Sequence, residues 1–403
     1  MPHKFWQAGY GKGVRKMVAD GQHLRSVVDF AHHQVFRYAT TYTAIHVLQR
    51  APNRGTIDYT RIDDLSDGIA QCRELEARPL GPYAGMTRRN VSQLPVGPGE
   101  FVFSDSVNAV VATGTKRLTE VADLAQGFKT GADKVFVVTL IGIKGGIATI
   151  RSAESGTKHK VEVTCLRPLV KSEHMKAYLL LPSRLRLILP YAPDGERWSL
   201  IKPADMRRDF PLLWNDYLLP MRSALDRREK GRFAGEHFYQ YSRPQNFAPL
   251  SKQKIINPDI CEHPQMCWDA EGDHVFSGGA AGGVAIVPND GVNPFYLLGV
   301  LNSDFADSWI RSNGTPFRGG YLNCEIRFIR NLPIKVPETA DEKKVAARII
   351  ESVRALMAAK SKVRSPKLSD RERKTLESEI ESHKHRIDEA VFALYGVKDL
   401  PKS

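Results

Sequence analysis

The segment Leu118–Ile141 reads LTEVADLAQGFKTGADKVFVVTLI. The first eight residues of this segment have helical apolar spacing, the glycines that follow predict a turn, and the run that ends it predicts a strand. Similar strand-like runs alternate with turns as far as Val336. This alternation predicts one mixed α/β domain over residues 118–337.

The residues before this segment predict an incomplete α/β domain and a connecting region. Gly9–Ala19 has helical spacing, and the β-branched runs Ser26–Phe30 and Thr40–Leu48 predict two strands. Because no strand precedes the first helix, we interpret residues 1–50 as the end of an α/β domain. Residues 51–117 are richer in glycine, proline and charge, which favours a connecting region.

The residues after Pro337 have a different pattern. Their apolar side chains repeat at helical spacing in two sets, which Ser365 and Pro366 separate. This pattern predicts a hairpin of two antiparallel helices over residues 338–403, with Gly396 as the C-terminal cap of the second helix. We interpret the charged positions of both helices as solvated faces.

The composition indicates a globular protein. Of the 403 residues, 42% are hydrophobic and 26% are charged, which excludes a disordered chain. The five cysteines are too few and too scattered for a disulfide scaffold. Neither a signal peptide nor an apolar run of about 18 residues is present. We therefore expect a cytoplasmic protein that does not enter a membrane.

The charge distribution indicates a polyanionic partner. The 58 Lys and Arg residues exceed the 45 Asp and Glu residues, which gives a net charge of +13. The excess lies in residues 1–50 (+5), 151–250 (+7) and 301–403 (+5), whereas residues 251–300 carry −4. Such clustering is expected when particular surfaces face phosphates.

Three patterns are similar to catalytic or ligand-binding motifs, and each has a simpler interpretation. Asn293–Tyr296 (NPFY) lacks the second proline of the Asn-Pro-Pro-Tyr loop with which amino-methyltransferases hold a base, so we interpret it as a helix start. Ser277–Gly283 (SGGAAGG) lacks GxGxxG spacing and predicts a tight β-turn or a loop that lets a backbone approach closely. Cys261, His263 and Cys267 do not have zinc-ribbon spacing. We therefore predict no catalytic and no metal-binding residues.

Several stretches combine cations, aromatic residues and glycines in a way that is typical of DNA-binding loops. Gly127–Gly131 offers backbone N–H groups, a hydroxyl and a cation to a phosphodiester. Further stretches of this kind are Arg227–Arg232, Arg243–Asn246 and Arg318–Tyr321. They add arginine, glutamine and asparagine, whose side chains form bidentate hydrogen bonds with guanine and adenine edges. These stretches predict contact with double-stranded DNA.

Taken in order, these and further stretches resemble the C-terminal, target-recognition part of adenine-specific DNA methyltransferases of restriction-modification systems, namely the TaqI-like and type IIG enzymes. The stretches that carry the resemblance include FWQAGYGKGVR (Phe5–Arg15), ATTYTAI (Ala39–Ile45), DLAQGFKTGADKVFVV (Asp123–Val138), LRPLVK (Leu166–Lys171), LLGVLNS (Leu297–Ser303), NLPIKVP (Asn331–Pro337) and RIDEAVFALYGV (Arg386–Val397). The resemblance covers nearly the whole chain. It implies an incomplete Rossmann-like methyltransferase tail over residues 1–50 and a target-recognition domain over residues 118–337.

Enzymes of this family transfer a methyl group from S-adenosylmethionine to the exocyclic amine of an adenine that is flipped out of the duplex. The family's cofactor loop and Asn-Pro-Pro-Tyr loop do not occur in this sequence. The resemblance therefore implies S-adenosylmethionine for a full-length or partner catalytic domain, and no cofactor for this chain alone. Phe36 matches the aromatic residue that stacks on the flipped base. The residues predicted to contact DNA are Lys12, Arg15, Lys129, Thr130, Gly131, Lys134, Arg227, Arg228, Arg232, Tyr239, Arg243, Gln245, Asn246, Arg318, Gly319, Gly320 and Tyr321.

The leading hypothesis is a DNA target-recognition polypeptide, either a truncated gene product or a subunit that complements a separate catalytic methyltransferase chain. One alternative is a self-contained S-adenosylmethionine-dependent methyltransferase that uses Asn293–Tyr296 and Gly278–Gly283. The other alternative is a protein-interaction scaffold in which the helices over residues 338–403 bind a partner.

Overall fold

The described residues of the computed structural model divide into two compact units. The described residues are 1–2, 4–7, 9–31, 33–38, 41–53, 55–66, 79–92, 94, 97, 101, 103, 114–195, 197–279, 282–313 and 321–397. Unit 1 comprises Met1–Thr115, Phe305–Asn323 and Tyr395–Ser403, and unit 2 comprises Lys116–Asp304 and Cys324–Leu394. The predicted mixed α/β class is confirmed, because both units contain sheets and helices.

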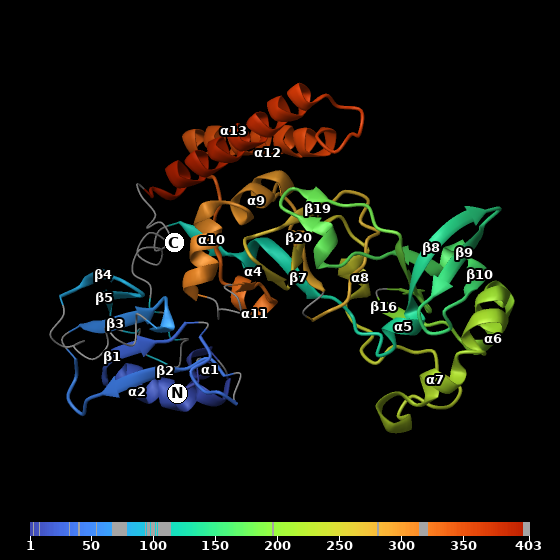
Figure 1. Cartoon of the computed structure of the whole chain (residues 1–403), viewed down its shortest axis with the longest axis horizontal. Coiled ribbons are helices and arrows are strands. Elements are labelled where there is room, and N and C mark those ends of the chain that lie inside the picture. The colour runs from blue at the N-terminus through green and yellow to red at the C-terminus, as the bar shows by residue number, and fades with distance from the viewer. Residues whose placement is uncertain are drawn as a thin grey trace. The chain divides into compact units, whose positions relative to one another are not determined.

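Unit 1 is built on a five-stranded sheet with the strand order β2-β1-β3-β5-β4 (Figure 1). The strands are β1 (Leu24–Asp29), β2 (Ala44–Leu48), β3 (Thr56–Ile62), β4 (Gly81–Tyr83) and β5 (Met86–Ser92). β1 runs parallel to β3, and the other neighbours are antiparallel. The two strands expected between residues 26 and 48 are confirmed as β1 and β2. Residues 51–117, expected as a connecting region, supply the other three strands of the sheet.

The helices at the start of unit 1 pack against this sheet. They are α1 (Lys4–Gln7), η1 (Gly9–Gly11) and α2 (Lys12–Asp20), and unit 1 also includes most of α10 (Asp304–Asn313). Phe5 and Trp6 are buried in one apolar cluster with Leu24, Val27 and Ile57 of the sheet. This cluster combines the first residues with the strands, and it accounts for the helical apolar spacing predicted over residues 9–19.

Unit 2 contains a five-stranded and a four-stranded antiparallel sheet besides smaller ones. The first has the strand order β10-β9-β8-β14-β11, with β8 (Val137–Lys144), β9 (Ile147–Ser152), β10 (Lys158–Glu162), β11 (Leu166–Pro168) and β14 (Leu185–Ile188). The second has the order β19-β17-β20-β7, with β7 (Ala122–Gln126), β17 (Lys254–Pro258), β19 (Cys267–Asp269) and β20 (Gly283–Pro288). Shorter strands of the chain are β6 (Thr115–Arg117), β12 (Met175–Lys176), β13 (Leu179–Leu180), β15 (Tyr191–Asp194), β16 (Arg197–Leu200), β18 (Ile260–Cys261), β21 (Leu322–Asn323) and β22 (Pro333–Lys335).

The helix predicted over residues 118–125 is wrong beyond its first turn. α4 ends at Val121, and the chain continues as β7, whose residues pair with β20 from Gln126↔Val284 to Ala122↔Pro288. The apolar positions of this stretch fit either structure, so the sheet partner decides, because pairing satisfies every second backbone group of the strand. The strand predicted at 134–141 is also shifted: α5 (Asp133–Phe136) comes first and β8 follows.

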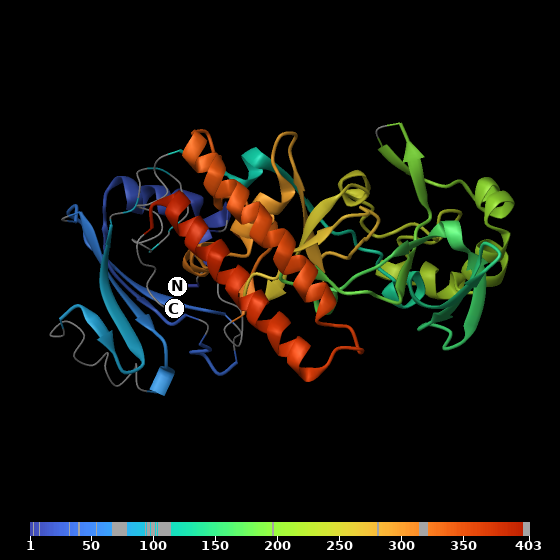
Figure 2. The ribbon, with the colours of Figure 1, turned by 90° about the horizontal axis from the view of Figure 1, so that it is seen from above.

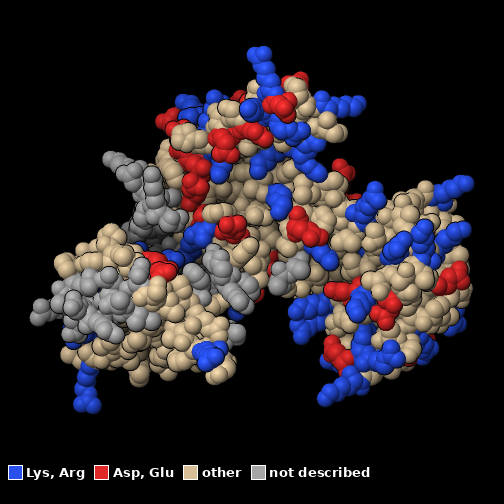
Figure 3. Space-filling view, in the orientation of Figure 1, with Lys and Arg blue, Asp and Glu red and all other residues tan. Residues whose placement is uncertain are grey.

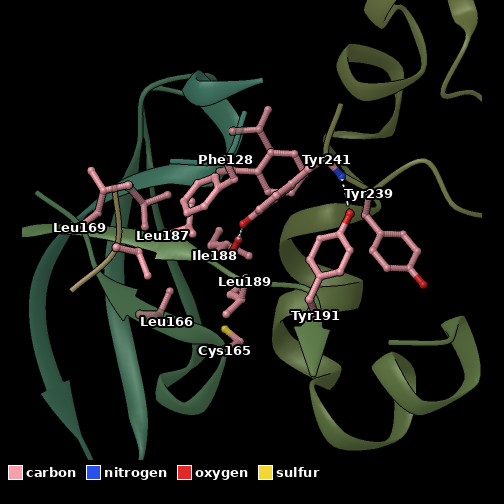
Figure 4. Packing of buried hydrophobic residues seen from close by; sticks show 14 of the residues in the cluster. Phe128, Cys165, Leu166, Leu169, Leu187, Ile188, Leu189, Tyr191, Tyr239 and Tyr241 are labelled. Atoms are coloured by element: carbon pink, nitrogen blue, oxygen red, sulfur yellow. Dashed lines mark hydrogen bonds between the residues drawn. The ribbon is translucent and has the colours of Figure 1, made fainter. Parts of the chain in front are cut away.

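An aromatic core joins the segments of unit 2 (Figure 4). Phe128 stacks on Tyr241 with 5.5 Å between the ring centroids, and Tyr191 lies 5.1 Å from the same ring. The buried hydroxyls have partners: Tyr241 donates to the Ile188 carbonyl at 2.5 Å, and the Tyr191 oxygen accepts from the Tyr241 N–H at 2.8 Å. Burial raises the pKa of Tyr191 to about 12. The core therefore fixes the loop that begins at Phe128.

Short helices follow the sheets of unit 2, and two long ones end the chain. The short ones are α4 (Leu118–Val121), α5 (Asp133–Phe136), η4 (Val163–Cys165), η5 (Ser172–His174), α6 (Pro203–Asp209), the π-helix η6 (Leu212–Leu218), α7 (Arg222–Asp226), η7 (Arg228–Gly231), α8 (Phe247–Leu250), α9 (Pro294–Leu301) and α11 (Ile326–Ile329). The long ones are α12 (Ala340–Lys362) and α13 (Asp370–Tyr395). No helix among the described residues is both long and apolar enough to span a membrane.

The predicted C-terminal helical hairpin is confirmed. α12 and α13 lie side by side in both views of the ribbon (Figures 1 and 2). Gly396 follows α13 with a φ of +66°, as expected for a glycine cap. α12 also belongs to the core of unit 2, since a Cβ on Gly299 of α9 would lie 2.5 Å from Ile349. That close approach requires glycine at position 299.

Candidate nucleic-acid interface

Three loops that are far apart in the sequence meet beside the end of β7. They are residues 127–131, 242–246 and 277–279, which we call the loop cluster. Lys129 and Arg243 exchange backbone hydrogen bonds of 3.3 and 3.0 Å, and Gly278 N–H donates to the Phe128 carbonyl at 2.9 Å. Two of the stretches predicted to contact DNA are thereby brought together. The third member, the glycine-rich loop, was predicted as a turn without a DNA role.

Glycines allow the three loops to approach this closely. A Cβ on Gly127 would lie 2.4 Å from the Phe276 carbonyl oxygen, and one on Gly278 would lie 2.8 Å from the Gly127 oxygen. Gly131 has a φ of +71°, and its Cβ would meet Ser242 at 2.8 Å. The prediction that the glycine-rich stretch lets two backbones approach is confirmed.

The side chains that project from the loop cluster are polar and exposed. Lys129, Arg243, Gln245 and Asn246 are all exposed. Gln245 Nε2 donates to the Gly127 carbonyl at 3.3 Å, and Asn246 Nδ2 donates to the Gln126 carbonyl at 2.8 Å. Each amide nitrogen carries two hydrogens, so both side chains keep one donor and the acceptor oxygen for another molecule. This is the combination that reads an adenine edge.

Arg228 supports the loop cluster from inside the unit. The side chain is 8% exposed, and its guanidinium donates to the carbonyls of Leu225, Thr130, Gln240 and Phe238 at 2.6–3.0 Å. The guanidinium also lies 4.8 Å from the centre of the Phe233 ring. Burial lowers the pKa of this guanidinium. Arg228 was predicted to contact DNA, and the structure corrects this: the side chain ties together the segments beneath the loops.

Asp259 supports the other side of the loop cluster. The side chain is 1% exposed, and its carboxylate accepts Gln126 Nε2 at 2.8 and 3.0 Å and Gly279 N–H at 2.9 Å. Burial raises the pKa of Asp259 to about 6, although these hydrogen bonds act in the opposite direction. No sequence pattern marks this residue, because a single aspartate in an apolar run is common.

Three further predicted DNA-binding residues are also buried and require the same correction. Arg15 is 3% exposed and donates to the Phe5 carbonyl at 2.7 Å within unit 1. Thr130 is 1% exposed, and its hydroxyl accepts the Ala132 N–H at 3.0 Å. Tyr239 is fully buried and donates to the Ile201 carbonyl at 2.5 Å. Each side chain holds its own loop or helix.

The remaining predicted DNA-binding residues lie outside the loop cluster. Lys12, Lys134, Arg227 and Arg232 are exposed, and Arg232 forms an ion pair of 3.4 Å with Glu229. Their contact with DNA stays a prediction. Tyr321, 44% exposed, and Phe36, 57% exposed, belong to unit 1. Arg318, Gly319 and Gly320 lie outside the described residues.

The patterns similar to catalytic motifs have structural roles. Asn293 caps α9, and its side-chain oxygen accepts the N–H groups of Phe295 and Tyr296 at 2.9 and 3.2 Å, which confirms the predicted helix start. Cys261 lies with its sulfur 3.4 Å from that of Cys324, and His263 is exposed. Cys267 donates to the Ile256 carbonyl at 3.7 Å.

One group of side chains among the described residues has ligand atoms within reach of a common metal ion: Asp269, Asp273 and His274. Within this group, both carboxylate oxygens of Asp269 already have partners in the protein. It is 1% exposed and forms a 2.6 Å salt bridge with Lys254, which is its register partner across β17 and β19. The group is therefore explained as a buried ion pair that His274 extends at 2.8 Å.

No family model matches the chain, whereas similar proteins are found by sequence and by fold. The chain is similar to the type II restriction enzyme and methyltransferase RM.Eco57I of Escherichia coli, with 21% identity over 418 residues that include 99% of this chain and 40% of that protein. The fold is similar to that of the type IIL restriction-modification enzyme MmeI, solved in complex with DNA. That alignment has a TM-score of 0.57 and 13% identity, and it covers all of this chain and 47% of that chain.

These relatives confirm the predicted resemblance to type II restriction-modification enzymes. The chain spans less than half the length of each relative. The likeness to MmeI concerns the fold alone, because the identity is low.

Proposed function

We propose that this chain is the target-recognition part of an adenine-methylating restriction-modification enzyme and that its loop cluster contacts double-stranded DNA. The observation that carries the proposal is the assembly of Lys129, Arg243, Gln245 and Asn246 on two adjoining loops, against which the glycine-rich third loop packs. The relatives support it, because RM.Eco57I is a restriction enzyme and methyltransferase and MmeI was solved with DNA.

The loop cluster divides the work of recognition between two kinds of side chain. Lys129 and Arg243 neutralise backbone phosphates, which provides affinity and fixes the register on the duplex. Gln245 and Asn246 carry amide groups of the kind that form bidentate hydrogen bonds with adenine edges in the major groove. Since the contacts come from neighbouring backbone segments, phosphates and bases of the same few base pairs can be bound together.

The buried groups beneath the loops make this arrangement rigid before DNA arrives. Arg228 joins four backbone carbonyls, and Asp259 joins Gln126 to Gly279. A loop that is already ordered loses less conformational entropy on binding, so more of the contact energy contributes to affinity. The support of Arg228 and Asp259 therefore serves recognition without touching the duplex.

S-adenosylmethionine does not fit the glycine-rich loop of this chain. The N–H groups of Gly278, Gly279, Gly282 and Gly283 already donate to Phe128, Asp259, Gly279 and Ser277 at 2.6–3.1 Å. A Cβ on Gly282 would lie 1.7 Å from the Ser277 oxygen, so the backbone of Ser277 already occupies the space beside this glycine. We infer that the cofactor is bound by a catalytic domain of the full enzyme or of a separate catalytic chain.

Phe36 of unit 1 is the side chain we assign to the flipped adenine. It is 57% exposed, an unusual position for a phenylalanine, and Tyr38 nearby in sequence is 92% exposed. An exposed aromatic ring offers a flat surface on which an unpaired base can stack. Phe36→Ala should lower the methylation rate of the assembled enzyme while leaving duplex affinity within about twofold.

The proposal is tested by selecting the DNA sequences that the purified chain binds from a random duplex pool. We expect enrichment of one short sequence and an affinity for it that falls steeply as salt increases. Calorimetry with S-adenosylmethionine on the same sample should give no heat of binding. The absence of any duplex binding at 50 mM salt would refute the proposal.

A further inference from the structure

The first sheet of unit 2 has an open face that none of the predicted DNA contacts includes. In β9, Ala148, Ile150 and Ser152 are buried, whereas Ile147 and Arg151, which alternate with them along the strand, are exposed. This period of two separates a core face from a solvent face. The solvent face of β8, β9 and β10 is thus the side of the sheet that lies away from the core.

The register of the three strands places cations together on this solvent face. Lys158 of β10 is opposite Arg151 of β9, and Arg151 is opposite Thr139 of β8. Lys160 is opposite Thr149 in the same way. Residues two apart on one strand lie about 7 Å apart, and neighbouring strands lie about 4.8 Å apart. The positive charges of this face are therefore close neighbours.

Lys144 extends the charged face to the end of the β8–β9 hairpin. It is paired with Ile147 across a turn made by Gly145 and Gly146, whose φ angles are +59° and +77°. Lys144, Ile147 and the turn glycines are exposed. The hairpin end thus carries a cation beyond the strands that the core covers. Lysine and arginine side chains are visible over this part of unit 2 in Figure 3.

Neighbouring acids do not neutralise this face. Lys144, Arg151, Lys158 and Lys160 are all exposed, and among the interactions found in the described parts of the chain none of the four has a salt bridge. The nearest acid on the same strand face, Glu162, is occupied, because its two oxygens accept the N–H groups of Leu212 and Leu213 at 2.8 and 3.0 Å. Four close, exposed cations without salt-bridge partners create a positive potential that attracts a polyanion, most strongly at low salt.

We propose that the solvent face of β8, β9 and β10 is a second phosphate-binding surface, through which duplex DNA outside the recognised base pairs is held. The proposal rests on the proposed function, since it assumes that the chain binds DNA through unit 2. Short side chains such as Thr139 and Thr149 separate the cations, and the face carries no amide side chains that would read a base edge. The surface therefore contributes affinity and does not discriminate between sequences.

The test uses the full chain with the substitutions K144Q, R151Q, K158Q and K160Q together. A matched control carries K343Q, K362Q, K374Q and K384Q, which remove the same charge from exposed positions of α12 and α13. Both variants should keep the circular dichroism and thermal midpoint of the parent chain, because all eight side chains are exposed. Affinity is measured by fluorescence anisotropy on a 40-base-pair duplex between 50 and 300 mM NaCl.

Each phosphate contact contributes about 0.9 to the slope of log affinity against log salt. The sheet variant should therefore lose about 3 to 4 units of slope and up to about a thousandfold in affinity at 150 mM salt. Its preference for the selected sequence over a random duplex should stay within about twofold of the parent. The control should lose less than one unit of slope.

Two results would overturn the inference. One is a sheet variant with the parent's slope, and the other is a control whose slope falls as far as that of the sheet variant. In either case the parent chain would still bind the duplex, so the proposed function would stand. A parent chain that does not bind DNA would instead refute the proposed function itself.

Discussion

Arg228 and Arg243 lie against the same short stretch of backbone, residues 129–130, and have opposite environments. Arg228 is 8% exposed and donates to the Thr130 carbonyl at 3.0 Å from inside the unit. Arg243 pairs with Lys129 through its backbone, and its side chain is exposed. Both belong to basic stretches that predict DNA contact. Burial alone separates a side chain that shapes the loop cluster from one that can bind a ligand.

The comparison shows that the loop cluster has an inner and an outer layer. The inner layer, Arg228 and Asp259, should determine stability, and the outer layer, Lys129, Arg243 and Gln245, should determine binding. A guanidinium surrounded by carbonyls has no capacity left for phosphate, whereas one in solvent contributes little to folding. Mutations that separate these two effects test the distinction directly.

The largest expected effect is that of Arg228→Met on the free energy of unfolding. Methionine keeps part of the apolar stem and removes the guanidinium donor from four carbonyls, of which that of Thr130 keeps the Ser242 N–H at 3.1 Å, so the loss should be about 3–5 kcal/mol. Urea denaturation followed by tryptophan fluorescence measures it. Arg243→Met is the matched control, and it should change stability by less than about 0.5 kcal/mol. Equal effects of both substitutions would contradict the two-layer account.

Asp259 should make stability depend on pH. Its pKa is about 6 in the folded chain, raised by burial, and about 3.9 when unfolded. Between these values the folded state binds more protons, so the stability contributed by Asp259 is complete below about pH 4 and is lost as pH rises to about 6. The total is about 3 kcal/mol.

This pH effect is isolated by comparison with Asp259→Asn, which cannot titrate. The difference in unfolding free energy between the parent and the variant should fall from pH 4 to pH 6 and then remain constant. Urea denaturation at four pH values measures the difference. A difference that does not vary with pH would show that Asp259 titrates normally.

Gly127→Ala should destabilise unit 2 by about 2 kcal/mol. The new Cβ would lie 2.4 Å from the Phe276 carbonyl oxygen and 2.5 Å from that of Ser277, and these backbone atoms cannot rotate away as a flexible side chain could. Gly142→Ala is the control, because no atom lies within 4 Å of its Cβ position, and it should be neutral or slightly stabilising. Thermal unfolding of the two variants in parallel checks the prediction, which fails if Gly127→Ala is tolerated as well as Gly142→Ala.

The smallest expected effect is that of Gln245→Ala, which should alter specificity and leave stability unchanged. Loss of one bidentate contact reduces discrimination at a single base pair by about 1 kcal/mol. Competition between duplexes that differ at each position of the selected site measures this. Lys129→Gln provides the contrast, since a phosphate contact affects all sequences equally. If Gln245→Ala weakens binding to all sequences equally, its side chain does not read a base.

Much of the architecture could be predicted from the sequence, because the relevant signals are local. The strands β1 and β2, the helix start at Asn293 and the helical hairpin all follow from residue spacing and capping. Residues 118–125 could not be predicted in this way, since their apolar positions fit a helix and a strand equally and the partner β20 decided. Pairing between two distant segments cannot be predicted from the residues of either segment alone.

The candidate site was predicted by residue type and only partly by position. Lys129, Arg243, Gln245 and Asn246 were identified, and their exposure agrees with the proposed role. The burial of Arg15, Arg228 and Tyr239 depends on tertiary contacts, which a basic or aromatic stretch does not reveal. The cations of β8–β10 could have been found from their alternation with buried residues over residues 147–162.

The most direct test of the central claim is the salt dependence of duplex binding by the chain that carries K129Q and R243Q together. If these two exposed cations contact phosphates, the slope of log affinity against log salt should fall by about 1.8. The unfolding free energy should remain within about 0.5 kcal/mol of the parent. A slope equal to that of the parent chain would contradict the assignment of the loop cluster to DNA.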